Sequence, residues 1–171
     1  MTEFPRGTSA ERIFALHEHR DLAPGIERLH AVAGAVGSIR SADLSLALLD
    51  VMDWVESVLE PHAAWEDAWL YPEIDRRTAT PWATKLMAFE HRQIRTIAAQ
   101  LHADRDVLHK GPSHEGAVEL RAHLFALEAL LRAHIEREER FLLPLLEDAA
   151  RGTVGVEAPT RARPGQEVPA G

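Results

Sequence analysis

Two histidine–glutamate pairs with identical spacing are the clearest chemical pattern in this sequence. His62 and Glu66 are four residues apart, and the same spacing returns 72 residues later at His134 and Glu138. Residues four apart lie on one face of an α-helix, with about 6 Å between them. Each pair therefore offers one imidazole and one carboxylate to the same site.

The 72-residue repeat extends well beyond these pairs. Glu18-His19-Arg20 returns as Glu90-His91-Arg92, and Leu29-His30 returns as Leu101-His102. Leucines and prolines around each pair also repeat, for example Pro72 and Pro144. The first half of the chain thus matches the second half without a gap, which predicts an internal two-fold pseudosymmetry.

The repeated polar residues are of the types that bind metal ions: His19, His62, Glu66, His91, His134 and Glu138. Bridging carboxylates offset the repulsion between two neighbouring cations, and Glu66 and Glu138 are suited to that role. His19 with His62 would then hold one ion, and His91 with His134 the other. Two nitrogens and two oxygens for each ion leave positions open for water, hydroxide, an oxo bridge or a small diatomic molecule. Imidazole and carboxylate suit iron or manganese, and zinc also binds such sets.

Apolar residues at helical spacing predict four long helices that position these side chains. We expect the first from Ser9 to about residue 36, with a kink at Pro24-Gly25, and the second from Ser41 to about residue 76. Pro61 and Pro72 are expected to bend the second helix.

The third helix is expected from Thr80-Pro81, as N-cap and first-turn proline, to about residue 110. Gly111-Pro112-Ser113 indicates a stop and a new cap, and the fourth helix then runs to about residue 150. The predicted fold class is all-α, an up-down-up-down four-helix bundle at residues 10–150. Residues 1–9 would form an N-terminal arm, and residues 151–171 a disordered tail rich in proline and glycine.

Composition excludes several other classes of protein. The formal charge of −8 without a basic cluster argues against nucleic acid as a partner. The sequence has no cysteine, so disulfides, thiolate metal sites and cysteine nucleophiles are all ruled out. No apolar run reaches membrane-spanning length, and the start lacks a signal peptide, so we expect a cytoplasmic protein without a membrane partner.

At these residues the sequence resembles the hemerythrin-like family, also called the HHE cation-binding domain. The matching segments are Glu18-His19-Arg20, His62 to Glu66, Glu90-His91-Arg92 and His134 to Glu138, and they recur in the order typical of the family. Such a resemblance, covering about residues 10–150, implies a left-turning four-helix bundle around a non-haem di-iron centre. It also implies oxygen, peroxide or nitric oxide as the small partner.

The sequence departs from the oxygen-carrying hemerythrins at two positions. Those proteins have a second histidine four residues after the third-helix histidine, where this chain has Arg95. They also have a late aspartate five residues after the fourth-helix histidine, where this chain has Glu139. The symmetric four-histidine, two-glutamate set is closer to the redox and nitrosative-stress branch of the family. Asp67 and Glu139 are candidates to support or replace the bridging glutamates.

Three readings of the function remain open at this point. The first is a di-iron protein that binds or reacts with oxygen, peroxide or nitric oxide, with or without enzymatic turnover. The second is an iron or oxygen sensor, or a metal-binding module without turnover. The third is a purely structural bundle. Separately, His30, His102 and His123 each lie 11 residues from a proposed ligand, which suggests a second histidine cluster or, more simply, three unrelated residues.

Overall fold

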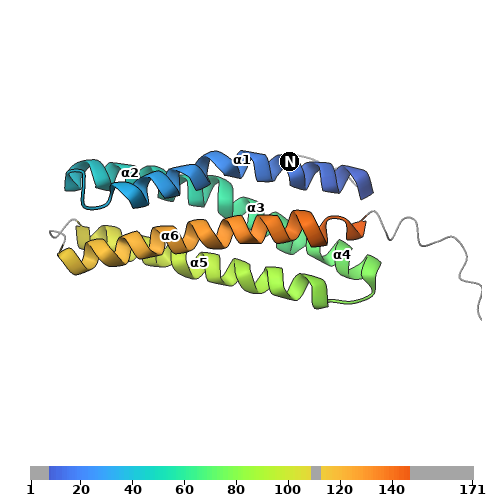
Figure 1. The fold of residues 1–171 in the computed structure, drawn as a ribbon. Coiled ribbons are helices and arrows are strands. Elements are labelled where there is room, and N and C mark those ends of the chain that lie inside the picture. Colours follow the sequence, from blue (N-terminus) through green and yellow to red (C-terminus); the bar gives the residue numbers. More distant parts are fainter. Residues whose placement is uncertain (1–7, 109–112, 147–171) are drawn as a thin grey trace, which may run out of the picture.

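The computed structural model describes residues 8–108 and 113–146, and within these ranges it consists of helices joined by short turns (Figure 1). Four helical runs follow one another along the chain. The first run is α1 (Thr8–Ala35), and the third is α5 (Trp82–Leu108). The second run is made of α2 (Ser41–Trp54), η1 (Val55–Leu59), α3 (Glu60–Trp65), η2 (Glu66–Leu70) and α4 (Tyr71–Thr78). The fourth run is α6 (His114–Arg137) followed by η3 (Glu138–Leu142).

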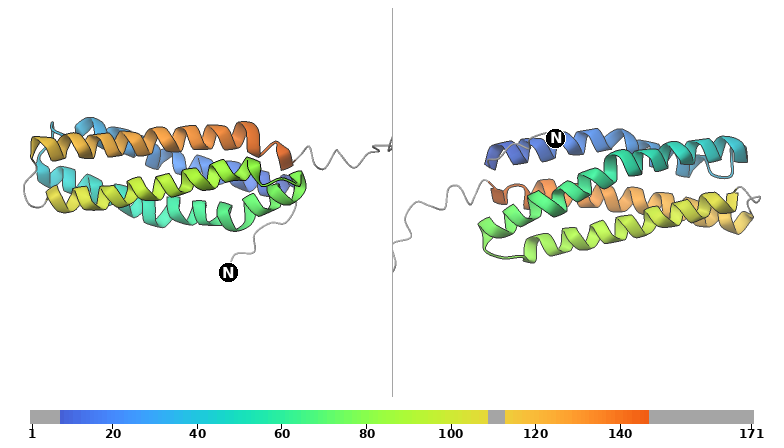
Figure 2. Two further views of the ribbon diagram at one scale, coloured as in Figure 1. Left: turned by 90° about the horizontal axis from the view of Figure 1, so that it is seen from below. Right: turned by 180° about the vertical axis from the view of Figure 1, so that it is seen from behind.

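The four runs pack side by side in the order of the sequence. α1 contacts α2 and α6, and α5 contacts α2 and α6, so each run has two neighbours. In Figure 2 the run from α2 to α4 crosses the bundle obliquely, and its last part lies beside the start of α5. This arrangement confirms the predicted all-α, up-down-up-down bundle.

The helix ends agree with the sequence at some positions and differ by one residue at others. The hydroxyl of Ser113 accepts a hydrogen bond from the Gly116 amide at 3.0 Å, as expected of the cap of α6. Ser41 is the first residue of α2, and Arg40 occupies the cap position without a side-chain hydrogen bond. Thr80 accepts from the Trp82 amide, but α5 begins at Trp82, so Pro81 lies just outside it. Thr8 and Ser9, predicted as the end of the arm at residues 1–9, already belong to α1. The rest of that arm, the predicted helix ends near residues 110 and 150 and the predicted tail at 151–171 lie outside the described residues.

Three π-helical turns, η1, η2 and η3, widen the second and fourth runs, and each lies just before a proline. The residue before the proline donates its amide to the carbonyl five residues back: Glu60 to Val55, Tyr71 to Glu66, and Leu143 to Glu138. Proline has no amide hydrogen and its ring displaces the carbonyl four residues before it, so the regular helical pattern cannot continue there. The bends predicted at Pro61 and Pro72 thus take the form of π turns. Pro24 is instead accommodated inside α1, which curves along its length (Figure 1).

Two separate apolar clusters fill the interior. Leu22, Leu59, Ile94 and Leu131 belong to the larger cluster, toward the turn between α1 and α2. The smaller cluster lies toward the opposite end of the bundle and includes Ala15, Leu70, Met87 and Leu142. In every run, the buried polar side chains between these two clusters are the repeated histidines and glutamates. The candidate ligands therefore form one polar layer between two apolar layers.

Among the described residues, no helix is both long and apolar enough to cross a membrane.

Candidate metal centre

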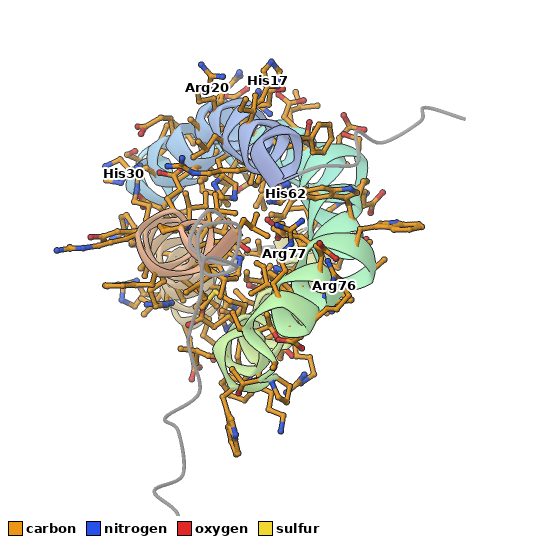
Figure 3. All side chains as sticks on the ribbon, turned by 90° about the vertical axis from the view of Figure 1, so that its right-hand side faces the viewer. His17, Arg20, His30, His62, Arg76 and Arg77 are labelled. Carbon is orange, nitrogen blue, oxygen red and sulfur yellow. The ribbon has the colours of Figure 1, made fainter. Side chains whose placement is uncertain are left out.

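The six residues predicted as ligands converge inside the bundle. The side chains come from all four runs, and none of the six residues is more than 4% exposed to solvent: His19, His62, Glu66, His91, His134 and Glu138. Figure 3 looks along the bundle and shows His62 directed inward, whereas His17 and His30 lie on the outside. The sequence repeat thus identified a set of residues that the fold brings together completely.

Glu66 lies between the two histidine pairs. Its Oε1 atom is 2.9 Å from His62 Nε2 and 3.4 Å from His19 Nε2. Its Oε2 atom is 3.2 Å from His91 Nε2 and 4.0 Å from His134 Nε2. Each carboxylate oxygen therefore faces one histidine pair, in the pairing expected from the sequence. Two groups of three closely spaced ligand atoms result, and both include Glu66.

Glu138 completes the layer from the fourth run. Its Oε2 atom is 3.2 Å from His19 Nε2 and 3.7 Å from His134 Nε2, so it contacts one histidine of each pair. His91 Nε2 and His134 Nε2 are only 3.2 Å apart. Nitrogen and oxygen atoms that normally bind cations are thus gathered at short distances from one another.

Several of these atoms are close together without being hydrogen-bonded. Both ring nitrogens of His62, Oε2 of Glu66 and Oε1 of Glu138 are buried and lack a hydrogen-bond partner. Buried polar atoms without partners are costly, unless another group satisfies them. Two ligand atoms at right angles around one ion, each about 2.1 Å from it, lie about 3 Å apart. The donor set and its spacing therefore fit metal ions.

The π turns contribute to the placement of both glutamates. Glu66 is the first residue of η2 and Glu138 is the first residue of η3, and Pro72 and Pro144 follow at the same distance. A π turn inserts one residue into the helical pattern and is frequent at functional sites. It also lets each helix carry the glutamate on the interior side while its leucines continue into the smaller apolar cluster.

Three carboxylates outside this layer hold the histidine rings in place. Glu139 lies 3.0 Å from His19 Nδ1, Asp67 lies 2.9 Å from His91 Nδ1, and Glu90 lies 3.0 Å from His134 Nδ1. We call Glu139, Asp67 and Glu90 the outer carboxylates. An ionised carboxylate can only accept hydrogen bonds, so each Nδ1 carries the proton. The Nε2 atom of each ring then points into the layer, where it could give its lone pair to a metal ion once any proton on it is released.

Arginines fix two of the outer carboxylates, and the sequence did not point to this role. Arg95 contacts Asp67 at 2.7 Å, and Arg137 contacts Glu90 at 2.5 Å. Arg95, whose side chain is 43% exposed, occupies the position where the oxygen-carrying hemerythrins have a histidine. Here that position supports the candidate ligand His91 indirectly, through Asp67. Each arginine lies on a different helix from its carboxylate, so the pairing could be recognised only from the packing of the helices.

Burial and mutual contacts set the protonation of the layer in the absence of metal. Burial lowers the pKa of His19, but its contacts with Glu138 and Glu66 outweigh this and raise the pKa to about 10. Burial raises the pKa of Glu66, yet the four surrounding histidines hold it well below its ordinary value. Burial and the charge of Glu66 raise the pKa of Glu138. Protons thus occupy the layer when cations do not, and metal binding must release them.

Tyr71 adds a polar group on one side of the layer. Its hydroxyl lies 3.3 Å from His91 Nε2, and its ring stacks on the imidazole with 5.4 Å between centroids. Burial and the negative charge of Glu66 raise the pKa of the hydroxyl, so it remains protonated. The residue 72 positions later is Leu143, which has no hydroxyl. The repeat therefore supplies this hydroxyl only once, from the second run.

The second histidine cluster suggested by the spacing does not form. His30 contacts Glu128 at 3.0 Å, His102 contacts Glu56 at 3.5 Å, and His123 contacts Asp104 at 2.7 Å. Within the described ranges, no group of ligand atoms close enough to hold a metal ion includes any of these three rings. The three histidines have the predicted spacing along their helices, but each ring faces a different carboxylate and not the other two rings.

Fold and site together define a class, a four-helix bundle with a buried histidine–glutamate centre for metal cations. Comparison with protein families supports the same class, because the family model of the hemerythrin HHE cation binding domain matches residues 15–146. The chain belongs to this family, as its repeated motifs had indicated. Comparisons with curated proteins and with solved structures gave no match.

Proposed function

We propose that this chain is a non-haem di-iron protein that binds or reacts with oxygen, peroxide or nitric oxide in the response to redox or nitrosative stress. The observation that supports this most strongly is the arrangement around Glu66, whose two oxygens each face a different pair of histidine Nε2 atoms. In this proposal His19 and His62 would hold one iron, His91 and His134 would hold the other, and Glu66 and Glu138 would offer carboxylate oxygens to both. Manganese and zinc are the alternative metals.

The chain's own groups give the site its selectivity. Iron, when bound, supplies electron transfer and an open position for a small molecule. The outer carboxylates keep the Nδ1 protons on three histidines, so their Nε2 atoms stay available as ligands. Tyr71 offers a buried hydroxyl beside His91 that donates a hydrogen bond. The candidate ligands are at most 4% exposed and lie between two apolar layers, which favours a small molecule such as oxygen, peroxide or nitric oxide.

A single comparison of two loaded forms tests this function. Protein loaded anaerobically with iron is mixed with hydrogen peroxide, and in separate samples with oxygen and nitric oxide, while absorbance and oxygen release are recorded. Zinc-loaded protein is the matched control, because zinc has no redox chemistry. We expect iron-dependent spectral changes with at least one of the three molecules. Identical behaviour of the iron and zinc forms would contradict the proposal.

The same data separate an enzyme from a sensor or a metal-binding module without turnover. Continued release of oxygen from excess peroxide indicates catalysis. Oxidation that stops after about one equivalent per site indicates a sensor or module. The cytoplasmic location expected from the sequence remains a prediction.

A further inference from the structure

The two halves of the metal centre are related by the 72-residue repeat, but their surroundings differ. His91 and His134 both have an outer carboxylate on Nδ1, namely Asp67 at 2.9 Å and Glu90 at 3.0 Å. Arg95 and Arg137 in turn hold these two carboxylates at 2.7 and 2.5 Å. Both imidazoles of this half are therefore fixed by a charged pair.

The half with His19 and His62 lacks most of this support. His19 Nδ1 contacts Glu139 at 3.0 Å, but the residue that corresponds to Arg95 is Ala23. The Glu139 side chain is also 41% exposed, against 32% for Asp67 and 8% for Glu90. Water therefore competes for Glu139 more than for either of the carboxylates in the other half.

No carboxylate within the described ranges bonds to Nδ1 of His62. Its Nδ1 atom is buried without a hydrogen-bond partner, although Glu18 corresponds to Glu90 in the repeat. The residue that corresponds to Arg137 is Trp65, which carries no positive charge and packs against Phe14 at 4.7 Å between ring centroids. This half therefore has no cation at the position that corresponds to Arg137. The repeat thus keeps the candidate ligands in both halves, whereas only His19 keeps a supporting carboxylate in the half with His62.

A hydrogen bond from Nδ1 to a carboxylate makes the imidazole a stronger donor to a metal and fixes the direction of its Nε2 lone pair. Removing such a partner typically weakens metal binding 10- to 100-fold. We propose that the two ion positions are unequal, and that the position formed by His91 and His134 binds its ion more tightly and fills first. Asp67, Glu90, Arg95 and Arg137 act there as positioning residues. This inference rests on the proposed two-ion centre.

The repeat itself provides matched pairs of variants for the test. Metal-free protein is titrated anaerobically with Fe²⁺, and in parallel with Co²⁺, whose visible absorption reports its ligands. Repulsion between two cations makes the second step weaker even in a symmetric site, so the number of steps alone decides nothing. The decisive comparison is Glu90→Gln against Glu18→Gln, which make the same chemical change at corresponding positions.

We expect Glu90→Gln to weaken the tighter step by about 10- to 100-fold, and Glu18→Gln to leave both steps within about threefold of the parent. If circular dichroism shows that Glu90→Gln does not fold, a second pair of variants, Asp67→Asn and Glu139→Gln, replaces the first pair. Asp67→Asn should weaken the tighter step, and Glu139→Gln only the weaker one. His62→Ala should keep the tighter step, which locates that step at the other pair.

Two results overturn the inference in distinguishable ways. Equal effects of Glu90→Gln and Glu18→Gln, or loss of the tighter step in His62→Ala, show that the halves are equivalent or that their order is reversed, while the two-ion centre stands. Failure of the parent protein to take up either metal removes the inference together with the proposed function.

Discussion

Replacing Glu66 with glutamine is expected to abolish stable binding of two ions. Glu66 is fully buried, and each of its oxygens faces a different histidine pair. The six proposed ligands carry only two negative charges, so this change removes half of the charge that offsets the cations. An amide also presents an N–H donor where a ligand oxygen is required. We expect the metal affinity to fall by more than about 100-fold, beyond the loss typical of an outer partner.

Metal content after dialysis and thermal unfolding with and without metal measure this effect. Metal raises the unfolding temperature of any protein that binds it only when folded, so it should stabilise the parent and not the variant. Glu136→Gln is the control, because it makes the same charge change on the fourth run at a side chain that is 72% exposed and contacts Arg140. A Glu66→Gln protein that retains two ions would contradict the assignment of the bridging ligand.

Gly25→Ala is expected to destabilise the fold by about 3 kcal/mol. A Cβ atom at this position would lie 1.8 Å from Cε2 of Trp54, whose indole is buried in the larger apolar cluster. Either α1 or the indole must then shift, and a packed interior resists both. The free energy of unfolding, measured with urea on metal-free protein, gives the magnitude.

Gly34→Ala on the same helix is the control, because an added Cβ there has no atom within 4 Å. Alanine reduces the freedom of the unfolded chain, so this variant should be about 0.5–1 kcal/mol more stable than the parent. Equal stability of the two variants would show that α1 does not approach Trp54 as closely as described.

The sequence predicted which side chains form the buried polar layer, because these candidate ligands are repeated at a fixed offset. A single histidine on a helix carries little information, but His62 with Glu66 and His134 with Glu138 in one register indicated both the face and the partners. Helical periodicity likewise predicted the four helical runs, and the cap at Ser113 predicted where the fourth run begins. These features depend on local spacing, which a sequence displays directly.

Features that depend on how helices rotate against one another could not be predicted in this way. The arginine supports at Arg95 and Arg137 require two helices to be in register, and spacing along one helix does not determine that. His30, His102 and His123 show the same limit, since equal spacing did not bring them together. The prolines at 61 and 72 indicated bends, whereas their form as π turns could be read only from the hydrogen bonds of Glu60 to Val55 and of Tyr71 to Glu66.

The most direct test of the central claim is the metal content and optical spectrum of protein purified without chelator. We predict two irons per chain, with near-ultraviolet charge-transfer bands that disappear on reduction and removal of iron. A protein that contains no metal, and takes up none on anaerobic reconstitution with iron, would contradict the di-iron centre and leave the repeated histidines and glutamates as a buried polar network.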